Sequence, residues 1–192
     1  MPAPSSFARK LATIAQNQHS TYHLLDEADP VLCKQIKKYW EGIAPFTSCV
    51  TVPWSAVFVS YCVKQAGATA AEFEFAQAHS VFVYEAIQNA INGTGVFHGL
   101  DISAHPPNVG DIIQNNRNGT SHDYAYARTH RNYESHSAIV VETGQDTTGR
   151  YALTIGGNEG NSIRRTVVRL NQQGFIKQRD VNPFICVIKT LK

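Results

Sequence analysis

The sequence is short of the features that mark membrane-spanning and nucleic-acid-binding proteins. Its 192 residues contain no apolar run approaching the roughly 20 residues that a membrane-spanning helix requires. Lysine and arginine total 17 against 15 aspartates and glutamates, and the resulting net charge of +2 is too small for a nucleic-acid-binding surface. We therefore predict no membrane span and no nucleic acid partner. The mild basicity favours an anionic surface such as a cell wall.

The start of the chain carries no standard export signal. Residues 1–20 lack the continuous apolar core and the small-residue cleavage site of a secretory signal. We expect the chain to be made in the cytoplasm without a signal peptide. If it acts in the periplasm or on the cell wall, non-standard export or cell lysis must deliver it there.

CxxC pairs and metal-ligand motifs are also missing. The four cysteines are Cys33, Cys49, Cys62 and Cys186. They form no CxxC motif and no zinc-finger spacing, so we interpret those inside predicted helices and strands as buried free thiols, with a disulfide left open. His122, Asp123 and His130 match no standard zinc or calcium pattern. The sequence predicts no metal and no organic cofactor.

The first half of the chain carries helical patterns. They cover residues 7–15, 29–43, 55–67 and 78–91. Asp29 and Pro30 suit the start of the second helix, and Gly67 suits the end of the third. We assign residues 1–28 to an N-terminal helical extension of the domain.

Beyond residue 100 the pattern changes to short β-branched runs that are typical of strands. These runs cover residues 111–115, 136–144, 150–158, 163–170 and 183–191. The first two are separated by a long polar loop, residues 115–135, and such loops are often functional. Residues 143–150 are expected to form the loop of a hairpin. Helices followed by an antiparallel sheet of about five strands predict a single α+β domain over residues 1–192.

Three polar residues occupy the positions that a nucleophile-and-base hydrolase needs. Ser55 opens the third helix, where free backbone N–H groups and the positive end of the helix dipole stabilise an oxyanion. His136 opens one predicted strand and Asn158 ends the next, in the sequence GGN, whose glycines are expected to let the backbone turn sharply. If these strands are antiparallel neighbours, the two side chains share one edge of the sheet. Glu159 is an alternative partner for the histidine.

Short motifs follow one another in a fixed order along residues 29–190. They are KKYW, PWSAVFVSYCVKQAG, AHSVFVYEAI, PPNVGDII, SHSAIVV, GGNEGNS and NPFICVIK. This series resembles the papain-like cell-wall peptidases of the NlpC and CHAP type, and motifs in order are more specific than any one alone. The closer resemblance is to a bacterial and phage branch, long classed as a domain of unknown function, in which serine often replaces the nucleophilic cysteine.

The resemblance implies a papain-like fold, with N-terminal helices packed on the sheet, and hydrolysis of an amide bond in peptidoglycan. The bond would lie within the stem peptide or between sugar and peptide. In this scheme Ser55 is the nucleophile, His136 is the base and Asn158 orients the imidazole. The residues expected to bind substrate are Trp54, His79, Tyr124, Tyr126 and Glu159.

Enzymes of this kind serve as phage lysins and as antibacterial effectors injected by a contractile, type VI secretion system. An effector implies an immunity protein that plugs the cleft. Two other functions stay open. One is a catalytically silent cell-wall-binding module in which Ser55 marks a dead site. The other is a hydrolase or acyltransferase acting on lipids or small esters, against which the polar loop at 115–135 argues.

Overall fold

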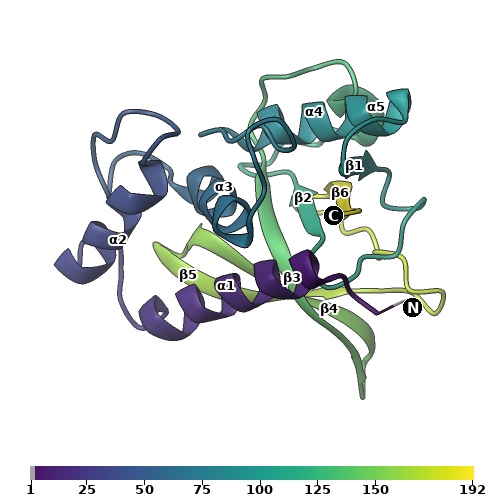
Figure 1. Ribbon diagram of the computed structural model, residues 1–192. Helices are drawn as coiled ribbons and strands as arrows, with labels where there is room; N and C mark the ends of the chain where they lie inside the picture. The colour runs from purple at the N-terminus through teal and green to yellow at the C-terminus, as the bar shows by residue number, and fades with distance from the viewer. Residues whose placement is uncertain (1–2) are drawn as a thin grey trace.

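Short apolar runs in the second half of the chain form one antiparallel sheet, and helices pack against it (Figure 1). The computed structural model describes residues 3–192. Its helices are α1 (Ser6–Tyr22), α2 (Pro30–Trp40), α3 (Ser55–Ala66), α4 (His79–Asn92) and α5 (Tyr124–Ala127). Its strands are β1 (Phe97–Leu100), β2 (Ile112–Asn115), β3 (His136–Asp146), β4 (Gly149–Glu159), β5 (Ser162–Arg169) and β6 (Phe184–Thr190). The predicted α+β class is confirmed.

Local signals set the ends of the long helices. The side chains of Ser5 and Asp29 cap α1 and α2 by accepting hydrogen bonds from first-turn amides, at 3.1 and 2.8 Å. Gly67 and Gly93 end α3 and α4 in left-handed conformations, with φ of 110° and 64°. The predicted helices are confirmed, but α1 continues to Tyr22 because no glycine or proline interrupts it. No helix within residues 3–192 is long and apolar enough to cross a membrane.

The sheet has six strands in the order β1-β6-β2-β3-β4-β5, one more than expected, and every neighbouring pair is antiparallel. The additional strand is β1, which has only four residues and so carries too short an alternation to be recognised. Its Gly99 permits close packing against α4, because a Cβ atom there would lie 2.6 Å from the Ile87 side chain.

The hairpin between β3 and β4 is tighter than the sequence predicts. The strands stay paired as far as Asp146 and Gly149, so only two residues form the loop instead of most of 143–150. Gly144 falls in the range expected to form the loop, but it lies in the ladder opposite Tyr151. A Cβ atom on Gly144 would sit 2.7 Å from the hydroxyl oxygen of Tyr151, so the tyrosine side chain covers the glycine.

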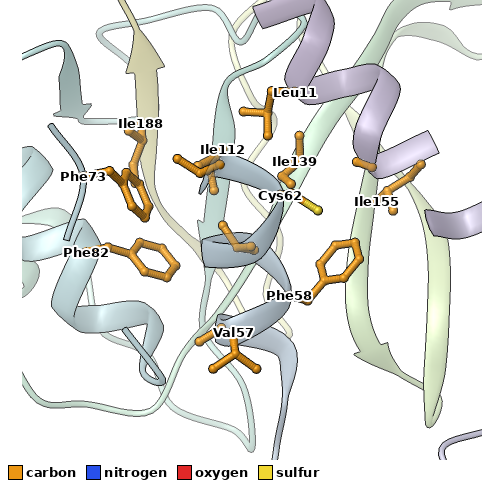
Figure 2. Packing of buried hydrophobic residues seen from close by; sticks show 14 of the residues in the cluster. Leu11, Val57, Phe58, Cys62, Phe73, Phe82, Ile112, Ile139, Ile155 and Ile188 are labelled. Carbon is orange, nitrogen blue, oxygen red and sulfur yellow. The ribbon is translucent and has the colours of Figure 1, made fainter. Parts of the chain in front are cut away.

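The core has two parts, one on each face of the sheet. On one face α1 and α3 contact β3 and β4, α2 packs against α3, and α4 packs beside β1 and β6. Figure 2 shows Phe58 and Cys62 of α3 facing Ile139 and Ile155 of the sheet. On the other face a smaller apolar cluster is closed by the segment between β5 and β6, which contributes Ile176. Since α3 is buried on nearly every side, its first residue is held in a fixed position.

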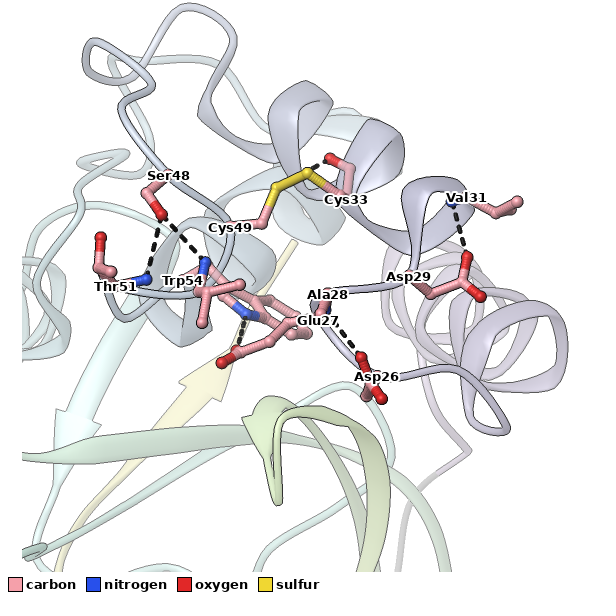
Figure 3. Close-up of a disulfide and its surroundings, with 11 residues drawn as sticks. Asp26, Glu27, Ala28, Asp29, Val31, Cys33, Ser48, Cys49, Thr51 and Trp54 are labelled. Carbon is pink, nitrogen blue, oxygen red and sulfur yellow. Dashed lines mark hydrogen bonds between the residues drawn. A yellow bond between two sulfur atoms is a disulfide. The ribbon is translucent and has the colours of Figure 1, made fainter.

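A disulfide joins Cys33 of α2 to Cys49 in the loop that leads to α3 (Figure 3). The two Cα atoms are 5.5 Å apart across a sequence separation of 16 residues. The expectation of a free thiol at Cys33 is therefore wrong, because the loop after α2 folds back over the helix and sequence spacing does not reveal that return. Cys62 and Cys186 are free and buried, as predicted.

Breaking the disulfide should destabilise the protein without unfolding its core. For a loop of this length, the restriction of the unfolded chain contributes about 3 kcal/mol to the free energy of unfolding. We expect Cys33→Ser/Cys49→Ser to lower that free energy by this amount in urea titrations, and reductant to do the same to the wild type. Reductant should leave the double variant unchanged; a further loss there would assign the effect to another site.

Candidate active site

The N-terminus of α3 places Ser55 inside the protein. Trp54 is the N-cap residue but makes no side-chain capping bond, so the first-turn amides of the helix lack the usual capping partner. Ser55 is 2% exposed, and the helix that follows it is almost entirely buried. A hydroxyl in this position lies beside free N–H groups and the positive end of the helix dipole, which together favour a developing negative charge.

The Ser55 hydroxyl is hydrogen-bonded to an imidazole. Its Oγ lies 2.7 Å from Nε2 of His79, which is the first residue of α4, so two helix N-termini meet at this pair. The predicted substrate-lining residue His79 is therefore a direct partner of the serine. The sequence predicts that the imidazole next to Ser55 belongs to His136. The structure instead places the imidazole of His79 at this position.

Burial keeps His79 neutral. The residue is 4% exposed, and the loss of hydration lowers the pKa of its imidazole well below the usual 6.5. The nearby His136 and the cation of Arg117 lower this pKa further. The ring of His79 also packs edge-to-face against that of His136, with 5.2 Å between the centroids.

His136 pairs with a carboxylate at the edge of the sheet. Because β3 and β4 are antiparallel, the first residue of β3 lies beside the last residue of β4, as the sequence predicts. Nε2 of His136 is 2.9 Å from Oε1 of Glu159, and the side chains are 16% and 20% exposed. Oε2 of Glu159 accepts a hydrogen bond from Oγ1 of Thr166 at 2.8 Å. The group that orients His136 is thus Glu159, the alternative that the sequence left open.

The two glycines of the GGN sequence provide space rather than a turn. Both lie within β4. A Cβ atom on Gly156 would lie 2.1 Å from Oε1 of Glu159 and 2.9 Å from Nε2 of His136, so a side chain there would displace the pair. A Cβ atom on Gly157 would lie 2.7 Å from Phe58 of α3. The left-handed residue is Asn158, with φ of 57°, which sits at an irregularity in the pairing with β5.

Asn158 anchors the helix and does not bond to the histidine. Its Oδ1 accepts a hydrogen bond from the backbone amide of Trp54 at 3.3 Å, and its Nδ2 donates to Oε2 of Glu27 at 2.7 Å. The same oxygen of Glu27 accepts from the Trp54 indole at 2.9 Å (Figure 3). The Trp54 ring is fully buried in the core rather than at a substrate surface. Glu27, Asn158 and Trp54 together fix the start of α3.

Glu27 was not identified from the sequence. It follows α1 in the run DEAD, where no spacing distinguishes it from Asp26 and Asp29. Its burial sets it apart in the structure, since Glu27 is one of the few buried acidic side chains.

The tyrosines predicted to form a substrate-binding lip hold the loop at 115–135 in place. The Tyr124 hydroxyl donates to the carbonyl oxygen of Gly99 at 2.9 Å, and partial burial raises the pKa of this tyrosine to about 12. The Tyr126 ring lies between the rings of His122 and His130, with centroids 4.1 and 3.8 Å away. The loop is therefore ordered by its own aromatic side chains and contains the short helix α5.

Among residues 3–192, no group of three or more His, Cys, Asp or Glu side chains is placed to hold a metal ion. The model of a family described as "Uncharacterized protein conserved in bacteria (DUF2272)" matches residues 14–185. No curated protein and no solved structure matches the chain.

Removing the Glu27 carboxylate should loosen the start of α3. In Glu27→Ala the Trp54 indole and the Asn158 amide lose their buried acceptor, and an unsatisfied buried donor costs roughly 1–3 kcal/mol. We expect a loss of this size in the free energy of unfolding measured with urea. Glu41→Ala, which removes an exposed acid at the end of α2, serves as the control and should change stability little. Equal effects of the two variants would contradict an anchoring role.

Proposed function

The chain belongs to the bacterial DUF2272 family, and we propose that it is a serine-dependent hydrolase that cuts an amide bond of peptidoglycan. The observation that carries the proposal is the meeting of Ser55, at a helix N-terminus, with His79 and with the His136–Glu159 pair at one site. Nucleophile, imidazole and orienting carboxylate are the components of a triad, which recurs on unrelated folds. We also propose that the fold is papain-like, because the motifs follow one another along the chain in the order typical of that superfamily.

The proposed reaction runs through an acyl-enzyme. Oγ of Ser55 attacks the amide carbon while its proton passes to His136, and the carbonyl oxygen becomes an oxyanion beside the first-turn amides of α3. When the intermediate collapses, the carbon–nitrogen bond breaks and His136 gives the proton to the leaving amine. Water then hydrolyses the ester by the same two steps, with His136 as base and then as acid. Glu159 keeps the imidazole in position and stabilises its protonated form.

The disulfide supports a site of action outside the cytoplasm. Disulfides such as Cys33–Cys49 persist in oxidising compartments and are rare where cytosolic reductants act. The periplasm and cell wall are therefore the proposed location, and peptidoglycan is the proposed partner. A phage lysin and an injected antibacterial effector both meet this condition, and in the second case an immunity protein would cover the site.

A second candidate function is a catalytically silent cell-wall-binding module. The observation in its favour is the burial of Ser55, whose hydroxyl is enclosed and already hydrogen-bonded. In this alternative the serine is a structural remnant of a catalytic position, and the site contributes only to binding.

Digestion of purified peptidoglycan separates the two candidates. Wild type is expected to release soluble fragments whose masses identify the bond, and Ser55→Ala should release none because it has no nucleophile. Ser60→Ala, which changes a second buried serine of α3, should keep the activity. A wild type that binds peptidoglycan without cutting it, together with activity in Ser55→Cys, would establish the silent module instead.

Substitution of neighbouring residues should distinguish orienting from anchoring roles. Glu159→Gln keeps the size of the side chain but removes the charge beside His136, so we expect kcat to fall by about 10²- to 10⁴-fold. Asn158→Ala should act mainly on the free energy of unfolding, since Asn158 contacts Glu27 and Trp54. The measurement pairs peptidoglycan kinetics with urea titration of each variant. A greater loss of kcat in Asn158→Ala would return the orienting role to the asparagine.

A further inference from the structure

Ser55 has a hydrogen-bonding partner, His79, to which the proposed reaction assigns no role. The two side chains are buried together at 2.7 Å, and such a bond has two possible directions. Either the hydroxyl donates its proton to a bare Nε2, or a protonated Nε2 donates to the hydroxyl oxygen. The first direction makes His79 a base for Ser55, whereas the second makes it a donor.

The charge state of His79 restricts the choice. A neutral imidazole carries one proton, so one ring nitrogen is a donor and the other an acceptor. Burial and the neighbouring charges lower the pKa of His79 well below 6.5 and keep it in this neutral form near pH 7. A group so reluctant to become positive is a poor recipient for the serine proton.

The second ring nitrogen selects the direction. Nδ1 of His79 is buried, and within the described residues 3–192 it has no hydrogen-bond partner. If the proton were on Nδ1, the site would contain an orphaned buried N–H donor, which folded proteins rarely tolerate. If the proton is on Nε2, the atom left without a partner is only a bare acceptor, and the N–H group is satisfied by Ser55.

We infer that His79 carries its single proton on Nε2, donates it to Oγ of Ser55, and thereby positions the nucleophile for His136. With one lone pair of the oxygen engaged by His79, the hydroxyl proton of Ser55 is left for a second acceptor. The imidazole next to His79 is that of His136, with 5.2 Å between the centroids of the two rings. In its catalytic meaning this inference rests on the proposed function, but the position of the proton does not.

The Nε2–H group of His79 acts at the step in which Ser55 loses its proton. As Ser55 loses its proton to His136, negative charge grows on Oγ, and the Nε2–H group of His79 stabilises that charge without transferring its proton. His79 therefore remains neutral through both steps. His79 is in this sense a positioning residue, and the proton count of the reaction described above is unchanged.

Nitrogen NMR on the full-length protein tests the position of the proton directly. With ¹⁵N-labelled histidine, protonated and bare ring nitrogens have distinct chemical shifts, and the His79 signals are those lost in His79→Gln. We expect a protonated Nε2 and a bare Nδ1 from about pH 5 to about pH 8, where exposed histidines titrate. A proton on Nδ1, or a second proton on the ring within this range, would overturn the inference.

A matched pair of variants tests the consequence for catalysis. His79→Gln can place an amide N–H group close to the position of Nε2, whereas the shorter His79→Asn cannot reach it. We expect Asn to lower kcat by about 10²- to 10³-fold with KM little changed, and Gln to recover much of the loss. An asparagine variant as active as the glutamine variant would remove the positioning role. If the wild type cuts no peptidoglycan, the proposed function fails while the NMR result still decides the inference.

Discussion

The carboxylate of Glu27 is the point on which the geometry of the site depends. It lies in the connection between α1 and α2, yet one of its oxygens accepts hydrogen bonds from Trp54 at the start of α3 and from Asn158 near the end of β4. A carboxylate removed from water is costly unless donors replace the lost hydration, so these three segments must stay together. The backbone amide of Glu27 adds a third connection, to the carbonyl oxygen of Asn161. The position of Ser55 relative to the sheet follows from this network, because Ser55 is the residue after Trp54.

Close packing between α3 and β4 is the second constraint, and both of the neighbouring glycines serve it. Gly157 lets Phe58 and Trp54 approach the strand, and Gly156 leaves the volume that the His136–Glu159 pair occupies. A methyl group at either position would overlap atoms that cannot move independently. The candidate site therefore lies where α3 packs closely on β4, and the same short sequence leaves room for the helix at Gly157 and for the His136–Glu159 pair at Gly156.

Much of this arrangement was accessible from the sequence. The capped helices, the long strands and the placing of His136 beside the end of the next strand follow from apolar periodicity, capping residues and antiparallel pairing. Three features were not accessible: the role of His79, the Cys33–Cys49 bond and the anchoring by Glu27. Each depends on segments that fold back from different parts of the chain, and local patterns carry no information on such contacts. The GGN sequence predicts a sharp turn, whereas the structure requires the small volume of its two glycines.

The two histidines of the candidate site are placed in different surroundings, and this difference supports the separate roles proposed for them. His79 is enclosed, and burial, the nearby His136 and the cation of Arg117 lower the pKa of its imidazole, so its environment favours the neutral ring. His136 lies at the partly exposed edge of the sheet, with Glu159 against its Nε2 at 2.9 Å. In the proposed reaction a donor fixes the Ser55 oxygen and an acceptor removes its proton, and these two tasks fall to different imidazoles. Assigning the acceptor role to His79 would place the growing positive charge on the ring whose burial and neighbouring Arg117 cation already disfavour it.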